Sequence, residues 1–205
     1  VSGILRETIA GYDLTYYYPK IIKSYSRLTG TADSIEVVKN TWSHLVLGGA
    51  GYPERVFHYI QYSVSSNKLT GHTVTGTFQY DNYGNPTSIV RSYSGGRTET
   101  TTNIFENIVS DTKWLLGRPT PTSIVYTSAG NPTITRSATR VFKPDNNKIE
   151  SEKWHSGTSQ EIIKSFIYNP NGSLKKETAT AGGVSRSVSY IYKADSIRIH
   201  STTDQ

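Results

Sequence analysis

The chain has 205 residues and a formal net charge of +6 at pH 7, so it is long enough for one large or two small domains and only mildly basic. It has no cysteine, which excludes disulfides, thiol nucleophiles and thiolate metal sites. No apolar stretch is long enough to span a membrane. The chain does not begin with methionine, so we expect either a mature product or an excised fragment of a longer polypeptide. Only 35% of the residues are hydrophobic, but 15 are Tyr and 17 are Gly, a mixture that suits strands joined by turns.

The first fifty residues are less regular than the rest of the chain. The segment 33–47 fits either a short helix or a strand, and Gly48-Gly49-Ala50-Gly51 marks a break. We therefore expect an N-terminal flanking segment over residues 1–50 and an antiparallel sheet over residues 51–205.

Period-two alternation dominates from about residue 55 onward. It is clearest over 72–80, 133–142 and 184–192, where one face of each predicted strand is rich in Ser or Thr. The connecting segments are too short for helical crossovers, and 94–96 and 181–183 have the glycines of tight hairpin turns. The sequence predicts an all-β fold, in which antiparallel hairpin repeats form a long curved sheet of about ten or more strands.

An internal repeat places an aromatic residue at the end of a strand, followed by a turn with Gly or Asn four residues later. The aromatic buries its ring over the turn, an Asp or Asn after it bonds turn amides, and Gly or Asn reverses the chain at low cost. We expect the aromatics to stack along the sheet, with Asn146 replacing Gly in a left-handed turn. The signature consists of Tyr80, Asp81, Gly84, Tyr126, Gly130, Phe142, Asn146, Tyr168, Gly172 and Tyr192.

Two segments of the chain resemble the Rhs/YD-repeat superfamily, which includes bacterial Rhs-type and Tc-toxin B/C-type shell proteins. Tyr80-Asp81-x-x-Gly84 matches the YD signature, and residues 111–120 resemble a Trp-Leu-Leu-Gly-Arg segment found among YD repeats. The resemblance covers roughly residues 55 to 200. It implies a β-sheet strip that forms part of a hollow shell around a toxin payload.

The chain also departs from that family. Only Tyr80-Asp81 keeps both letters of the signature, and the Asp is replaced in the other copies by Thr127, Lys143, Asn169 and Lys193. The self-cleavage site of the family has no match, so that activity is not carried over to any residue.

No residue pattern indicates catalysis, a metal site or a cofactor. His44, His58 and His72 are evenly spaced, but equal spacing does not bring ligands together, and surface or strand-face imidazoles are the simpler interpretation. Trp154-His155, beside two glutamates, fits the edge of a strand better than an active site. Basic residues are scattered rather than gathered in a run, so we expect no nucleic-acid partner.

The sequence therefore favours a non-catalytic structural segment of an Rhs/YD-repeat protein that scaffolds or encloses a toxin or effector payload. Its partners would be the rest of a larger polypeptide or companion subunits, and its location secreted or in a bacterial cell envelope. The alternative is a surface module that binds glycan or protein through Trp42, Tyr59 and Tyr62, since aromatic rings form platforms for sugars. A third hypothesis, a hydrolase, requires a pocket in which a histidine and a carboxylate converge.

Overall fold

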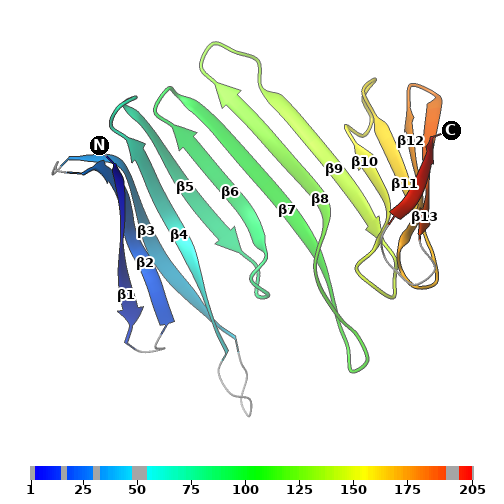
Figure 1. Ribbon diagram of the computed structural model, residues 1–205, viewed down its shortest axis with the longest axis horizontal. Helices are drawn as coiled ribbons and strands as arrows, with labels where there is room; N and C mark the ends of the chain where they lie inside the picture. Colours follow the sequence, from blue (N-terminus) through cyan, green and yellow to red (C-terminus); the bar gives the residue numbers. More distant parts are fainter. Residues whose placement is uncertain (1–2, 15–17, 30–32, 48–54, 193–198, 205) are drawn as a thin grey trace. The chain divides into compact units, whose positions relative to one another are not determined.

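The computed structural model describes residues 3–14, 18–29, 33–47, 55–192 and 199–204, which form an all-β structure without helix (Figure 1). Fourteen strands are hydrogen-bonded to one another in the order in which they occur in the chain. Every pairing with a described register is antiparallel, which confirms the predicted antiparallel hairpin sheet. The strands are β1 (Ile4–Asp13), β2 (Tyr18–Leu28), β3 (Ser34–Leu47), β4 (Arg55–Asn67), β5 (His72–Tyr80), β6 (Pro86–Tyr93), β7 (Arg97–Val109), β8 (Trp114–Ser128), β9 (Ile134–Phe142), β10 (Ile149–Trp154), β11 (Ile162–Tyr168), β12 (Leu174–Ala181), β13 (Val184–Tyr192) and β14 (Ile199–Asp204).

The strands with the clearest alternation form where the sequence predicts them. The segments 72–80, 133–142 and 184–192 become β5, β9 and β13. Between β12 and β13 the turn consists of Gly182 and Gly183, whose φ angles are 55° and 80°. Two successive positive φ angles match the right-handed twist of the flanking strands, which explains why this turn needs two glycines.

The first fifty residues contain β1, β2 and β3, so the segment 33–47 is a strand rather than a helix. β3 pairs with β4 from Glu36↔Asn67 to Leu47↔Arg55. The pairing of β3 with β4 thus joins the first three strands to the strands that follow, and the predicted break at 48–51 lies outside the described residues.

The chain divides into two compact units. The first contains residues 1–102 and 124–134, which include β1 to β6, the start of β7 and the end of β8. The second contains residues 103–123 and 135–205, which include the end of β7, the start of β8, β9 except its first residue, and β10 to β14.

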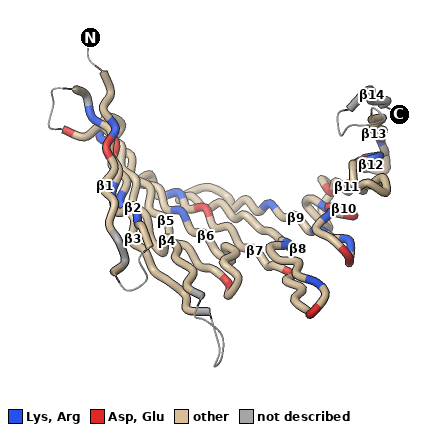
Figure 2. Tube along the Cα trace, turned by 60° about the horizontal axis from the view of Figure 1, so that its bottom comes forward, with Lys and Arg blue, Asp and Glu red and all other residues tan. Residues whose placement is uncertain are grey.

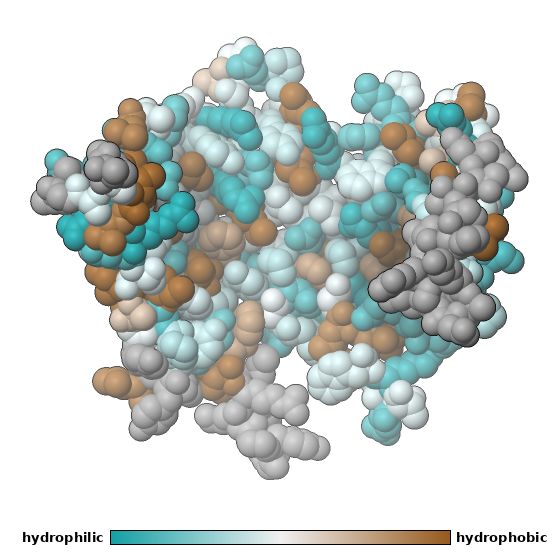
Figure 3. Space-filling model, viewed as in Figure 1, coloured by the Kyte–Doolittle hydropathy of each residue, from teal (hydrophilic) through white to brown (hydrophobic). Residues whose placement is uncertain are grey.

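Both units have almost no hydrophobic core. Among the described residues, Ala138 is the only buried hydrophobic one. The buried residues with polar or charged side chains are Ser26, His58 and Arg118. Large apolar side chains are exposed instead, for example Val184 (68%) and Ile104 (60%). Hydrophilic and hydrophobic residues are interspersed on the face drawn in Figure 3. Backbone ladders and cross-strand side-chain pairs therefore carry the stability that a second packed layer supplies in most domains.

Charged residues are distributed along the strands and turns of each unit rather than gathered in one patch (Figure 2). Several form cross-strand ion pairs, such as Arg91–Glu99 at 3.0 Å and Arg140–Glu152 at 2.7 Å. A helix long and apolar enough to cross a membrane does not occur in the described part of the chain.

Candidate functional site

The turns 81–85, 143–148 and 169–173, here called the repeat turns, share one backbone hydrogen-bonding scheme. In each, the residue after the strand-end aromatic donates its backbone N–H to a carbonyl oxygen across the base of the turn. The pairs are Asp81 to the carbonyl of Asn85 (3.0 Å), Lys143 to that of Lys148 (2.9 Å) and Asn169 to that of Ser173 (2.8 Å). The carbonyl of that same residue accepts the N–H three positions later: Gly84 at 3.1 Å, Asn146 at 3.4 Å and Gly172 at 2.8 Å. The repeat seen in the sequence thus corresponds to a recurrent local structure.

The hydrogen bonds of Asp81 explain why a carboxylate follows the aromatic in the first repeat turn. Its Oδ1 accepts the backbone N–H of Tyr83 at 2.8 Å and of Asn85 at 2.9 Å, and its Oδ2 accepts from Asn85 Nδ2 at 2.8 Å. One side chain therefore satisfies several turn donors. The residue at the same place in the third turn, Asn169, donates from Nδ2 to Ser173 Oγ at 2.9 Å.

The repeat glycines adopt the left-handed conformation that the turn chemistry predicts, with φ of 83° at Gly84, 74° at Gly130 and 89° at Gly172. The expectation that Asn146 adopts the left-handed conformation is wrong. Among the non-glycine residues of the described part of the chain, only His155 has a positive φ. The base of the 143–148 turn spans one residue more than those of the other two repeat turns. That extra residue reverses the chain without a left-handed Asn, and Asn146 Oδ1 instead accepts the N–H of Lys148 at 2.8 Å.

Tyr80, Phe142, Tyr168 and Tyr192 are each the last residue of a strand, and all four strands are odd-numbered. Tyr126 lies two residues before the end of β8 instead. Since neighbouring strands are antiparallel, β8 ends at the opposite edge of the first unit from β5 (Figure 1). The expectation that the repeat aromatics stack at equivalent strand ends along the sheet is therefore wrong for Tyr126. The ring of Tyr80 contacts Phe57 and Tyr59 rather than another repeat aromatic.

The hydroxyls of the last two aromatics make equivalent hydrogen bonds. Tyr168 donates to the carbonyl of Ile149 at 2.9 Å, and Tyr192 donates to the carbonyl of Leu174 at 2.8 Å. Ile149 and Leu174 are the first residues of β10 and β12, the strands that pair with β11 and β13. Each tyrosine thus fixes the start of the neighbouring strand, a contact that the sequence analysis did not predict.

We expect Tyr168→Phe and Tyr192→Phe each to lower the free energy of unfolding by about 1 kcal/mol, because each removes one hydrogen bond and leaves its ring in place. Urea unfolding monitored by circular dichroism measures the change. Tyr62→Phe is the matched control, because the Tyr62 side chain is exposed and its hydroxyl has no hydrogen-bond partner among the described residues. An equally large decrease in the free energy of unfolding for Tyr62→Phe would contradict the stabilising role given to the Tyr168 and Tyr192 hydroxyls.

Burial raises the pKa of Tyr168 above its ordinary value of 10.0. The folded state therefore favours the protonated phenol over the tyrosinate. The resulting stabilisation is fully present at a pH below the pKa of Tyr168 in the unfolded chain, and it is lost as the pH rises through the pKa of Tyr168 in the folded chain. We expect the free energy of unfolding to fall above about pH 10, while the absorbance of tyrosinate rises over the same range. Tyr168→Phe is expected to reduce this slope, and an unchanged slope would contradict the assignment to Tyr168.

Basic side chains cover several of these rings. Lys143 and Lys148 place Nζ 5.5 and 5.2 Å from the centroid of Tyr168, and Arg97 lies 5.6 Å from that of Tyr126. Their aliphatic stems shield apolar surface while the charge remains near the π face. Three of the basic residues thus pack against repeat aromatics.

Tyr80 is covered by aromatic residues instead. Its ring centroid lies 4.8 Å from Tyr59 and 5.7 Å from Phe57, and the ring of Phe57 lies directly over Gly84 in the repeat turn. Tyr59, a candidate for ligand binding, is therefore part of this internal cluster.

The other two candidate binding aromatics are on β3 and β4. Trp42 donates from Nε1 to the carbonyl of Ile21 at 2.9 Å, where β2 and β3 diverge, and its ring is tilted against Tyr18. Tyr62 is 39% exposed. Of the three, only Tyr62 presents an exposed side chain.

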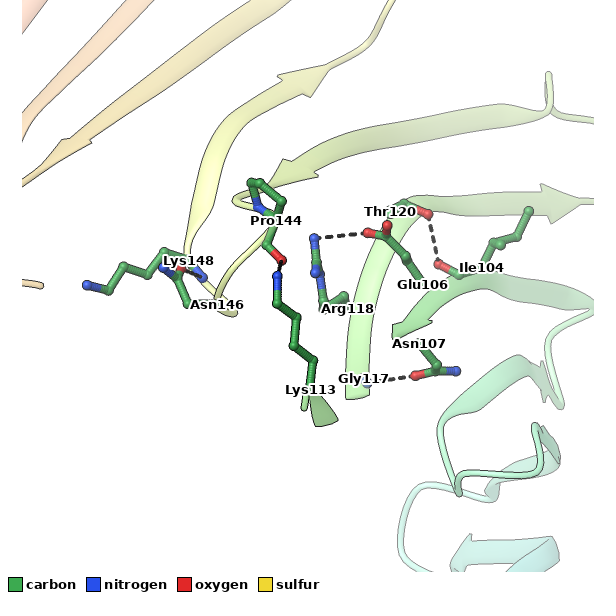
Figure 4. Close-up of polar contacts among 10 residues, drawn as sticks. All are labelled: Ile104, Glu106, Asn107, Lys113, Gly117, Arg118, Thr120, Pro144, Asn146 and Lys148. Carbon is green, nitrogen blue, oxygen red and sulfur yellow. Dashed lines mark hydrogen bonds and ion pairs between the residues drawn. The ribbon is translucent and has the colours of Figure 1, made fainter. Parts of the chain in front are cut away.

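A second structural centre, absent from the site predictions, surrounds Arg118 in the Trp-Leu-Leu-Gly-Arg segment (Figure 4). Gly117 has a φ of 71° within β8, and its N–H is bound by Asn107 Oδ1 at 2.9 Å. A positive φ inside a strand is typical of a bulge, which redirects the following side chain. Arg118 is 2% exposed, pairs with Glu106 at 3.0 Å and lies 4.9 Å from the ring centroid of Phe142. The glycine before the arginine was the sequence signal for this arrangement.

The nearby turns are also joined. Lys113, before β8, donates from Nζ to Asp145 Oδ1 at 2.7 Å and to the carbonyl of Pro144 at 3.4 Å. The Lys113 ammonium holds the pKa of Asp145 below its usual value through this hydrogen bond and its charge. The β7–β8 connection is thus tied to the second repeat turn.

The histidines do not converge on one point. His44 and His58 are cross-strand partners whose ring centroids lie 5.9 Å apart, and His58 stacks on Tyr18 at 4.2 Å. His72 pairs with Asn67 at another level of the sheet. Groups of His, Asp and Glu arranged to hold a metal ion are absent from the described residues.

The segment Trp154-His155 forms the start of a turn. His155 has a φ of 51°, and its carbonyl accepts from Thr158 Oγ1 at 2.7 Å. Glu152, two residues before Trp154 on β10, is paired with Arg140. These contacts give the cluster a structural role.

Comparison of the chain with models of known protein families and with curated proteins found no match.

Proposed function

We propose that the chain is a non-catalytic structural segment of a larger Rhs/YD-repeat-type assembly, in which it scaffolds or encloses a payload. The observation that carries the proposal is the recurrence of one turn structure, with its strand-end aromatic, in hairpins joined in chain order. Repeats of this kind build extended sheets in which each hairpin contacts its neighbours, and such sheets serve as walls and scaffolds.

The near absence of a core supports the same proposal. A chain of this length that functions alone buries many large side chains, whereas here Ala138 is the one buried hydrophobic residue of the described part. Exposed apolar residues such as Ile104, Trp114 and Val184 favour contact with further protein. The resemblance of Tyr80-Asp81-x-x-Gly84 and of the Arg118 segment to YD-repeat proteins supports a shell as the form of that assembly.

The test is the mass of the native polypeptide in its source, with peptides mapped beyond both ends of the sequence. We expect a longer polypeptide with further copies of the aromatic and turn, together with a segment that resists protease until the sheet is unfolded. A native product of 205 residues with no associated subunit would overturn the proposal.

The alternative function, a surface module that binds glycan or protein through aromatic side chains, has less support from the geometry. The indole of Trp42 and the ring of Tyr59 take part in internal contacts, which leaves Tyr62 as the exposed member of the set. A glycan array in which Tyr62→Ala abolishes a signal given by the intact chain would favour it.

A further inference from the structure

A hollow of about 230 Å³ lies on one face of the first three strands. The side chains that define it come from alternate positions of β1, β2 and β3, which the register places on the same face: Arg6, Thr8, Ser24, Ser26, Glu36 and Val38. All belong to the first unit.

The hollow exists because of the residues on the central strand. Arg6 pairs with Ser26, and Ser26 with Glu36, so a short side chain lies between two long ones. Ser24 occupies the same place between Thr8 and Val38. The two serines form a floor of hydroxyl groups, and Ser26 is itself buried, with 9% of its surface exposed.

The two walls carry opposite charges. Glu36 accepts from Ser26 Oγ at 3.5 Å and from Asn67 Nδ2 at 3.3 Å, so its carboxylate is fixed by neutral donors. Arg6 has no carboxylate partner among the described residues. The adjacent Glu7 is already paired with Arg27 at 2.9 Å and accepts the hydroxyl of Tyr25.

We propose that this hollow binds a small acidic sugar of the uronate class. β1 and β3 are two strand spacings apart, roughly 10 Å, which accommodates one pyranose ring between the walls. The sugar carboxylate pairs with the guanidinium of Arg6, which binds carboxylates in a two-pronged geometry. Its ring hydroxyls donate to Glu36 and exchange hydrogen bonds with Ser24 and Thr8. This binding does not depend on the proposed scaffold function.

The experiment is a titration of the ¹⁵N-labelled chain with D-glucuronate, followed by NMR. We expect a millimolar dissociation constant, with amide shifts confined to the strand segments around Arg6, Ser24 and Glu36. D-glucose lacks the carboxylate and acetate lacks the ring hydroxyls, so each is expected to bind at least tenfold more weakly. If acetate binds as tightly as D-glucuronate, the carboxylate contact with Arg6 alone accounts for binding and the proposal is overturned. An absence of amide shifts at the hollow would also overturn it.

Three variants define the contacts. Arg6→Ala is expected to weaken glucuronate at least tenfold, and Ser24→Val to abolish binding by filling the floor with a good strand former that keeps the sheet intact. Arg186→Ala is the matched control, because Arg186 flanks a hollow of about 210 Å³ in the second unit whose other lining residues are Glu177, Ala179 and Val188. Binding that is lost in the control but kept in Arg6→Ala would place the sugar elsewhere.

Discussion

Gly84→Ala is expected to lower the free energy of unfolding of the first unit by roughly 3 kcal/mol. Two independent costs add at this residue. Its φ of 83° is unfavourable for any residue with a Cβ. An added Cβ would also lie 2.9 Å from the ring of Phe57, which is held in place by Tyr59 and Tyr80. Urea unfolding, monitored by the aromatic near-ultraviolet circular dichroism of this cluster, measures the loss.

Gly130→Ala separates the two costs. Gly130 belongs to the same unit and has a φ of 74°, but no atom lies within 4 Å of the Cβ position. We expect it to cost about 1 kcal/mol, the backbone contribution alone. Equal losses in the two variants would show that the Phe57 ring does not constrain the turn.

Glu106→Ala is expected to lower the free energy of unfolding by roughly 3 kcal/mol, because it leaves the charge of Arg118 buried without its carboxylate. Arg118 Nε and Nη1 already lack hydrogen-bond partners within the described residues. Removing the charge should therefore cost little, and we expect Arg118→Met to remain within about 1 kcal/mol of the unmodified chain. Urea unfolding of both variants and of the double variant gives the coupling energy.

The double variant should be no less stable than Arg118→Met alone, since Glu106 is partly exposed and needs no partner. Glu152→Ala is the matched control. Its partner Arg140 is more exposed and retains Thr122 Oγ1 at 3.3 Å, so the loss should be smaller. A loss in the control that equals that of Glu106→Ala would contradict the role given to burial.

The sequence predicted those strands in which polar and apolar residues alternate along the chain. β5, β9 and β13 follow this pattern, and the Gly182–Gly183 turn follows from backbone sterics alone. The segment 33–47 remained ambiguous because its local pattern suits both helix and strand. Its pairing with β4 decides the outcome, and pairing is not encoded in either segment alone.

The contacts that depend on register could not be predicted from the repeat. The burial of Arg118 requires Gly117, Glu106 and Phe142 to meet from three strands. The hydroxyl contacts of Tyr168 and Tyr192 also reach residues 19 and 18 positions away. Motif spacing identifies candidate residues, but only the alignment of strands shows which atoms meet.

The position of Tyr126 has a consequence for how such a chain grows. Strands follow one another in chain order, and four of the five repeat aromatics end odd-numbered strands. Duplication of a whole hairpin adds two strands and keeps every later aromatic turn at its edge. Gain or loss of a single strand would transfer all the later turns to the other edge and expose each aromatic to new neighbours. Insertions that keep every aromatic turn at its edge of the sheet are therefore those that add an even number of strands.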